Sequence, residues 1–429
     1  MYIGDVTSLR IAATALLLTT WLSGCTSPCQ SAIDQLDKAM WQASAEAGTG
    51  IQQANTGDYH FGVAISKTAL LSLLSQVDLE IGVLQAREQI IEDRSRVTLI
   101  LRAEPHLLEI RPIADSEDQV QVVFTSDVKV TVATPGRAAE YVIATRLSIP
   151  GELQFASDDH GVPMVVAQLE SIEQGVVELG QLSVEDEIRS AVSHFVMTEL
   201  GESHLSLGRI PLLRFPSISV LGLPVNPLPI GLEISPLTGT LYLGFTTNLR
   251  PRSRQQLSRN WSVEEGEIAF VIHPGLLDAL LGLGAVERYY PVRAPRISES
   301  VSMLNRGVTI EEQHFTAIWD VYSSDQRACG VTELAVEGWA TIQEGSVVLT
   351  PTDGALAGQA LANLSEPSQW LETSPVLTSL QAASLFLSLS RIGLGRTGWA
   401  PVRVEEFDGA PDRILIRTFP TYLLTRSAN

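Results

Sequence analysis

Two stretches of the sequence decide the fold: residues 61–74, FGVAISKTALLSLL, and residues 268–281, IAFVIHPGLLDALL. In each, apolar residues first alternate, as in a strand with one buried face, and then recur at helical spacing. Ser66 precedes the first helical part as an N-cap, and Pro274 occupies a favoured helix-start position in the second. Six apolar positions match at an offset of 207 residues: Phe61, Val63, Ile65, Leu70, Leu73 and Leu74 correspond to Ile268, Phe270, Ile272, Leu277, Leu280 and Leu281. Both stretches therefore predict a strand followed by a short amphipathic helix.

The residues after each stretch continue in a similar order. Long alternating runs predict strands of an antiparallel sheet in both halves: 97–101, 120–124, 128–132 and 141–155 in the first, and 308–322 and 332–349 in the second. Each set of strands is followed by a long helix: an amphipathic helix from Ser183 to a stop at Gly201, and a helix without charged residues over 374–390. The halves close at Phe215-Pro216 and at Phe419-Pro420, 204 residues apart. We therefore predict an α+β fold of two pseudo-repeated halves.

A proline-dense segment separates the halves, with six of the 22 prolines between Pro211 and Pro236. Proline favours extended backbone and is excluded from helix interiors, so an extended connector is expected here. The predicted organisation assigns 58–216 to the first half, 217–250 to the connector and 251–429 to the second half. Residues 25–57 contain a short helical pattern and then a Gly-, Gln- and Thr-rich run, which indicates a tether.

The N-terminus carries a targeting signal. Residues 11–22 are an uncharged apolar run that is too short to cross a bilayer, and Leu22-Ser23-Gly24-Cys25 follows directly. This ending resembles the lipobox of bacterial lipoproteins, whereas the alternative is an ordinary secretory signal with a chance cysteine. The resemblance implies that residues 1–24 are removed and that Cys25 carries acyl chains, such as palmitate, which hold the exported protein on a bacterial membrane. Thr26 follows in place of Asp, which by the enteric rule favours the outer membrane, facing the periplasm or the surface.

Export also places the remaining cysteines, Cys29 and Cys329, where a disulfide can form. They lie far apart in the sequence and one is in the predicted tether. Such cysteines are more often unpaired than bonded, so the sequence leaves both alternatives open.

The layout from about residue 58 to 420 resembles the tubular lipid-binding superfamily, of the bactericidal/permeability-increasing protein type. That resemblance implies two halves, each a twisted sheet wrapped around a long helix, with acyl chains held in apolar grooves between helix and sheet. The apolar helix positions that would line such grooves are Leu70, Leu73, Leu74, Ile188, Val192, Phe195, Leu277, Leu280, Leu281, Leu380 and Leu387. The same side chains would also suit an ordinary packed core, which is the alternative for each of them.

Composition excludes several function classes. The chain has 49 acidic and 29 basic residues, a net charge of −20, so a nucleic-acid partner is not expected. None of the three lysines follows a glycine-rich loop, and there is no nucleophile elbow or zinc-helix motif, so neither a cofactor nor catalysis is predicted. Glu312 and His314 share a predicted strand face, but no third metal ligand is evident, so no metal site is assigned to them. His194 and His204 flank a helix end, where a histidine favours the negative helix terminus, so no catalytic role is assigned to them.

One basic stretch opposes the acidic body. Residues 206–260 contain six arginines against the single acid Glu233, with the highest density in RPRSRQQLSR at 250–259. The arginines that could dock an anionic head group or an acidic partner are Arg250, Arg252, Arg254 and Arg259, and the alternative is a solvated loop.

Two functions follow from these observations. The first is a membrane-anchored lipoprotein that binds lipid or another apolar small molecule and is not an enzyme. The second is an assembly lipoprotein that uses the same fold as a scaffold for a protein partner. The acidic body argues against a broadly cationic binder of head groups and favours neutral or single-headed lipids.

Overall fold

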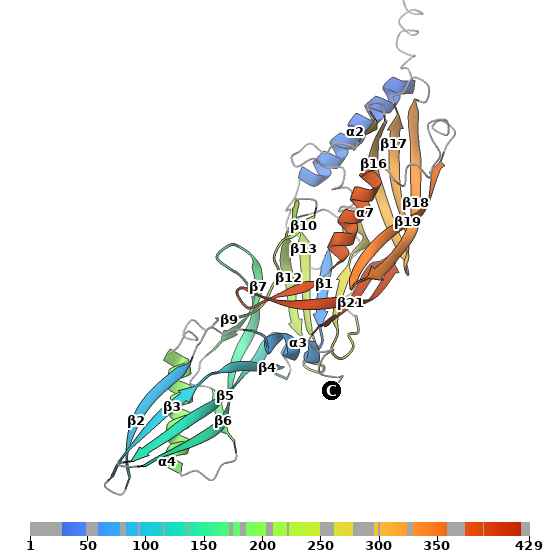
Figure 1. The fold of residues 1–429 in the computed structure, drawn as a ribbon. Coiled ribbons are helices and arrows are strands. Elements are labelled where there is room, and N and C mark those ends of the chain that lie inside the picture. Colours follow the sequence, from blue (N-terminus) through green and yellow to red (C-terminus); the bar gives the residue numbers. More distant parts are fainter. Residues whose placement is uncertain are drawn as a thin grey trace, which may run out of the picture.

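The computed structural model shows an elongated molecule built mostly of antiparallel β-sheet with a few helices (Figure 1). The structure describes residues 28–48, 59–77, 83–92, 95–114, 116–134, 137–170, 175–180, 186–202, 209–220, 223–248, 261–277, 296–298, 301–323, 329–357, 374–388 and 390–421. In this part of the chain no helix is both long and apolar enough to cross a bilayer.

The middle of the molecule is organised around β1 (Phe61–Ile65), the first of the two predicted strands. β1 lies between β13 (Leu241–Thr247) and β14 (Ile268–Ile272), the second predicted strand, and both pairings are antiparallel. β12 (Pro227–Ile234) pairs with β13 at the sheet edge, and β22 (Arg413–Pro420) continues the sheet beyond β14. All four ladders are antiparallel. β1 and β14 each have a partner strand on both sides, so they are interior strands.

The register of β1 against β14 places Val63 opposite Phe270. These two residues are separated by the same 207 positions that relate the two apolar patterns in the sequence. In both places a helix follows the strand directly. Helix α3 (Lys67–Leu74) begins after Ser66, whose side chain accepts a hydrogen bond from the Ala69 amide, and residues 274–277 are helical after β14. The predicted strand-then-helix order is therefore present at both sites.

One end of the molecule is formed by seven strands. They are β2 (Leu84–Glu92), β3 (Ser95–Ala103), β4 (His106–Pro112), β5 (Gln119–Thr134), β6 (Arg137–Ser157), β7 (Pro163–Leu169) and β8 (Val176–Leu179). Of these, the alternating runs of the first half predict β3, β5 and β6. Helix α4 (Asp186–Glu202) lies beside these strands, against β2 and β8 (Figure 1). The helix continues through Gly201, which we predicted to stop it.

Strand β9 (Arg209–Arg214) joins this end to the rest of the sheet. It pairs with β7 on one side and with β20 (Arg391–Leu394) on the other. β20 pairs with β21 (Gly398–Ala410), and β21 pairs with β22. The hydrogen-bonded path therefore runs without a break from β12 through the centre to β2.

The opposite end is a separate five-stranded sheet. Its strands, in spatial order, are β15 (Arg296–Ser298), β16 (Val301–Glu311), β17 (His314–Ser323), β18 (Gly330–Gln343) and β19 (Ser346–Ala357). Helix α7 (Ser374–Leu387) packs on β19, and helix α2 (Pro28–Gly48) packs on β17 and β18 (Figure 1). Two helices thus cover this sheet.

Two predicted single strands are in fact hairpins. The run 308–322 turns at Glu312, where the backbone has a φ of 55°, and the run 332–349 turns at Glu344 and Gly345, with φ values of 52° and 77°. The alternation of apolar residues continues through each turn, so periodicity did not reveal the reversal. Glu312 therefore sits in a turn, which corrects the prediction that it shares a strand face with His314.

The proline-dense connector also differs from a simple extended linker. Within 217–250 the chain forms β10 (Ile218–Val220), β11 (Leu223–Val225), β12 and β13, and the last two belong to the main sheet. Pro227 and Pro229 are tolerated in β12 because it lies at the sheet edge, and the register shifts by a bulge after Pro229. As predicted, the segment contains no helix in its described residues.

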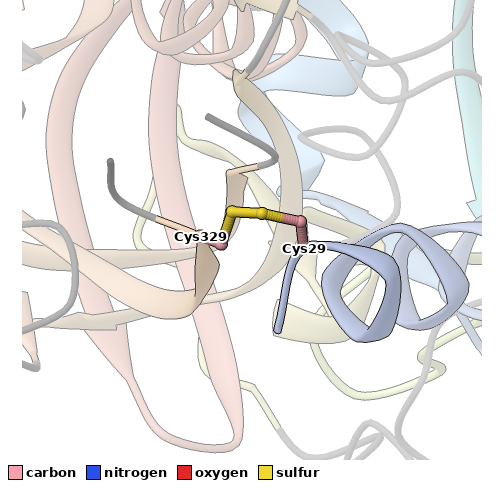
Figure 2. The surroundings of a disulfide bond; sticks show 2 residues. All are labelled: Cys29 and Cys329. Atoms are coloured by element: carbon pink, nitrogen blue, oxygen red, sulfur yellow. A yellow bond between two sulfur atoms is a disulfide. The ribbon is translucent and has the colours of Figure 1, made fainter. Parts of the chain in front are cut away.

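Helix α2 is part of the folded body, although we placed it in a tether. Ala32 is buried on the helix, and Leu36 and Ala39 pack against the buried Leu304 and Tyr322 of the five-stranded sheet. At the helix start Cys29 forms a disulfide with Cys329, the residue before β18, with 4.8 Å between the Cα atoms (Figure 2). The cysteines that the sequence left unassigned therefore clamp the first turn of α2 to the sheet. The remainder of the predicted tether lies outside the described residues.

Candidate ligand-binding pocket

The alternation of β1 and β14 separates two faces of the central sheet. Phe61, Val63 and Ile65 belong to the main core, with Phe270 and Ile272 from β14 on the same face. On the other face, Ala64, Ala269 and Val271 pack beneath Trp261 in a smaller cluster. The larger residues therefore face the interior of the molecule, where helix α7 lies.

Helix α7 is apolar on more of its surface than its packing covers. Its buried residues are Val376, Leu380, Ala383, Phe386 and Leu387. The helix is attached to β19 by two hydroxyls, since Ser384 accepts from the Leu349 amide at 3.0 Å and Ser388 donates to the Val347 carbonyl at 3.1 Å. On the uncovered side, Leu385 remains 57% exposed and Leu377 38% exposed.

A cavity of 410 Å³ lies between the last turn of α7 and the central sheet. Its floor and walls are mainly apolar: Phe61, Val63, Phe215, Pro216, Ile218, Pro227, Phe270, Ile272, Leu385, Phe386, Ile392 and Gly393. Its remaining lining residues are polar, basic or aromatic: Arg214, Ser217, Ser219, Ser388, Ser390, Arg391 and Trp399. A volume of this size falls within the roughly 300–1,000 Å³ range of small-molecule sites.

Two arginines and a tryptophan gather at one side of this pocket. The guanidinium carbon of Arg391 lies 4.2 Å from the ring centre of Trp399, and that of Arg214 lies 5.1 Å from the same centre. Both distances suit cation–π contacts. Arg214 reaches this position from the end of β9, and its Nη1 donates to the backbone carbonyl of Arg396 at 2.5 Å. The three side chains come from strands that are distant in sequence but neighbours in the sheet.

One acid, Asp158, interacts electrostatically with the pocket residue Arg214 at longer range. Among the residues that the structure describes, no carboxylate lies within salt-bridge distance of Arg214 or Arg391, and none lines the pocket. The Nε atom of Arg214 is buried and has no hydrogen-bond partner. Buried donors of this kind are rare in folded proteins because losing water without a partner costs about 1–3 kcal/mol. The pocket thus combines an apolar interior with two arginines that form no salt bridge with a described carboxylate.

A buried ion pair lies at the start of β14. The Glu267 side chain is 1% exposed and accepts two hydrogen bonds from Nη1 of Arg417, at 2.9 and 3.0 Å. It also accepts from the Glu264 amide at 2.6 Å. Burial raises the pKa of the Glu267 carboxyl, while the Glu264 amide and Arg417 oppose that rise. This pair holds the entry to β14 against β22.

The predicted groove residues occupy the main core rather than the pocket lining. Those within the described residues are all buried, with exposures of 0–8%: Leu70, Leu73, Leu74, Ile188, Val192, Phe195, Leu277, Leu380 and Leu387. None of them lines the 410 Å³ pocket. Leu280, Leu281, Cys25 and the arginines Arg250, Arg252, Arg254 and Arg259 lie outside the described residues.

The pocket residues that sequence reasoning missed had partial signals. Phe61, Val63, Phe270 and Ile272 were recognised as strand residues with one buried face, but their pattern does not say what covers that face. Leu385 and Phe386 lie next to Leu387 in the helix that was predicted to line a groove. Arg214 belongs to the basic stretch 206–260 that the sequence singled out. Arg391 and Trp399 carried no signal, because only sheet pairing brings them to Arg214.

The described ranges contain no assembled metal site. No group of three His, Cys, Asp or Glu side chains there is arranged to hold a metal ion. His314 begins β17 and lies 3.9 Å from a Glu337 oxygen on the neighbouring strand, and its ring meets that of Trp339 edge-on. His194 is exposed on α4, and His204 lies outside the described residues.

Comparisons with known proteins leave the chain without a family assignment. No family model matches the sequence, and no curated protein matches it. Among solved structures, the crystal structure of a lipopolysaccharide binding protein aligns with 84% of this chain and 98% of its own length. The two are 11% identical, with a TM-score of 0.35. Similarity at this level does not place the chain in that protein's family.

Proposed function

We propose that this chain is a membrane-anchored, exported lipoprotein that binds lipid or another apolar ligand in the pocket between α7 and the central sheet. The observation that carries the proposal is the 410 Å³ cavity itself, whose floor is built from Phe61, Val63, Phe270 and Ile272. An apolar cavity of this kind gains from a hydrocarbon ligand because each buried methylene contributes about 0.8 kcal/mol. No enzymatic activity is part of the proposal.

The proposed architecture is two pseudo-repeated halves, 58–216 and 251–429, each with a twisted sheet and a long helix. The pairing of Val63 with Phe270, at the same offset as the sequence patterns, supports it. The strand-then-helix order after β1 and β14 supports it as well. In this arrangement the pocket lies where the central sheet meets the second half.

Export and anchoring rest on the N-terminal sequence. We propose that residues 1–24 are a signal peptide, that Cys25 carries the acyl anchor, and that the protein sits on a bacterial outer membrane. The disulfide between Cys29 and Cys329 supports export, since such bonds persist in oxidising compartments. Replacing Cys25 by Ala should abolish labelling by a radioactive or alkyne-tagged fatty acid, and persistent labelling would contradict the anchor.

Ligand binding is tested with two matched variants of α7. Leu385→Glu places a carboxylate at a pocket residue that is already half exposed, so the fold should tolerate it. Leu377→Glu makes the same change on the same helix at an exposed residue that does not line the pocket. The body without its signal should bind a neutral apolar fluorescent probe and release lipid on organic extraction, as seen by mass spectrometry.

The expected pattern separates the pocket from the rest of the surface. Leu385→Glu should weaken probe binding by about 10-fold or more, because hydrocarbon no longer meets an apolar wall. Leu377→Glu should bind like the unchanged protein. A body that carries no lipid and binds no probe would overturn the proposed function, and equal loss in both variants would place binding elsewhere.

A further inference from the structure

Two arginines, Arg214 and Arg391, line the pocket beside Trp399. Resting on the proposed function, we infer that the pocket selects a single-chain amphiphile with one anionic head, a carboxylate or a phosphate monoester, and that Arg391 and Arg214 bind this head. The chain would occupy the apolar floor and the head would lie beside Trp399. This assigns a chemical class to the ligand of that site.

The electrostatic arrangement favours an anion at this point. Two guanidinium groups lie over one tryptophan ring, at 4.2 and 5.1 Å from its centre, and no described carboxylate lies within salt-bridge distance of either. Like charges brought together repel unless a counter-charge lies nearby. The cation–π attraction of both guanidinium groups to the Trp399 ring offsets only part of this repulsion. Asp158 acts on Arg214 only at longer range, so an anionic head group between the arginines would supply a closer counter-charge.

The hydrogen-bonding state of Arg214 points to the same ligand. One of its donors is satisfied by the Arg396 carbonyl, which fixes the guanidinium in place. Its Nε is buried, so the fork open to a head group is formed by the two terminal nitrogens. Carboxylate and phosphate oxygens match this fork geometry and make the stronger, charge-assisted hydrogen bonds. A neutral alcohol head would make no such charge-to-charge contact with either arginine.

The surroundings restrict the anion to a small, single-headed molecule. The chain has a net charge of −20, so a large anionic surface such as an acidic bilayer is repelled by most of the protein. The two arginines form a local exception at the opening of a 410 Å³ cavity. Such a site can take one head with its attached chain, whereas a bilayer face would meet the acidic body.

Three amphiphiles with the same tail test the inference: dodecanoate, dodecyl phosphate and 1-dodecanol, each below the concentration at which it aggregates. Their affinities are measured by displacement of the neutral fluorescent probe N-phenyl-1-naphthylamine. We expect the two anions to bind about 10- to 100-fold more tightly than the alcohol, the range that charge-assisted hydrogen bonds provide. Inorganic phosphate and acetate, which lack the tail, should not displace the probe at the same concentrations.

Variants then assign the head to the arginines. Arg391→Gln, Arg214→Gln and the double variant should lose the preference for anions while keeping the affinity for 1-dodecanol. Arg413→Gln removes the same charge at an exposed residue outside the pocket and should keep the preference. If Arg214→Gln fails to fold, the Arg391→Gln variant alone tests the inference. Arg391 is exposed, so its replacement should not disturb the fold.

Each outcome has one meaning. Equal binding of all three amphiphiles by the unchanged protein, or an anion preference that survives in Arg391→Gln and the double variant, overturns the head-group inference while the pocket stands. Displacement by phosphate or acetate alone would show a site for free anions and also overturns it. Failure of every amphiphile and of the probe to bind overturns the proposed function itself.

Discussion

Val63 of β1 lies directly opposite Phe270 of β14 in an antiparallel ladder, and both side chains line the same pocket. The ladder therefore brings the corresponding positions of the two sequence patterns together at one point. Around them the interior face of the sheet carries large apolar residues, while the opposite face carries Ala64 and Ala269 beneath Trp261. The pocket floor is consequently part of the main hydrophobic core, and changes to it affect stability as well as binding.

Phe270→Ala should lower the free energy of unfolding by about 3–5 kcal/mol, because it removes a buried ring and enlarges the cavity beside it. Urea or guanidinium denaturation followed by circular dichroism measures this change. Leu385→Ala, at a half-exposed residue on the other wall, should cost less than about 1 kcal/mol. If the loss in Phe270→Ala is as small as the one expected for Leu385→Ala, Phe270 does not contribute to the core.

Arg417→Leu should destabilise the protein by about 3–5 kcal/mol, since it leaves the Glu267 carboxylate buried without its cation. The double variant Arg417→Leu with Glu267→Gln should recover much of that loss, because no uncompensated charge is then buried. Denaturation of the single and double variants forms the measurement. If the loss of unfolding free energy in the double variant equals the sum of the losses in the two single variants, the two residues are not coupled.

The stability of the protein should depend on pH through Glu267. Its folded-state pKa is raised by burial, so the folded protein holds this proton more tightly than the unfolded chain. The corresponding stability is fully present below the ordinary pKa of 4.5 and is lost as pH rises through the raised value. Glu267→Gln should remove this component, so the difference in unfolding free energy between variant and unchanged protein should vary with pH above 4.5. A pH-independent difference would contradict this.

Breaking the disulfide should release helix α2 from the five-stranded sheet. Cys329→Ser should lower stability by about 2–4 kcal/mol, and proteases should then cleave within residues 28–48. Thermal unfolding and limited proteolysis of the purified body measure both effects. A reducing agent should reproduce them in the unchanged protein and have no effect on the variant. Equal protease resistance with and without the bond would show that packing alone holds the helix.

Gly62 is required where Trp261 covers the outer face of β1. A Cβ atom at this position would overlap the Trp261 ring, so Gly62→Ala should displace the indole. We expect lower stability and a red-shifted tryptophan fluorescence as the ring meets water. Gly161→Ala is a control for glycine replacement, because nothing lies near a Cβ there, although its φ of 76° adds a separate backbone strain. An unchanged emission spectrum in Gly62→Ala would contradict the packing of Trp261.

The local elements were largely predictable from the sequence. Alternation over 61–65 and 268–272 identified two strands that the structure confirms, and Ser66 was correctly identified as an N-cap. The helix at 374 was also recognised from its apolar spacing. These features succeed because the side-chain periods of strands and helices are local properties of the chain.

Three features required the tertiary structure. The hairpin turns at Glu312 and Gly345 interrupt neither run of alternating residues, so the alternating pattern does not reveal them. The Cys29–Cys329 bond depends on where α2 packs. In the predicted grooves, apolar helix residues suited a core and a ligand equally well, and burial decided their place only after the sheets were assembled.

The sequence by itself determined the kinds of element, the acidic character of the body and the matching patterns 207 residues apart, because each is set by residues close together in the chain or by composition. Only the tertiary structure decided the pocket and its charge. Arg214, Arg391 and Trp399 meet because β9 pairs with β20 and β20 with β21, and strand pairing between distant segments is governed by the packing of the whole sheet rather than by any local pattern.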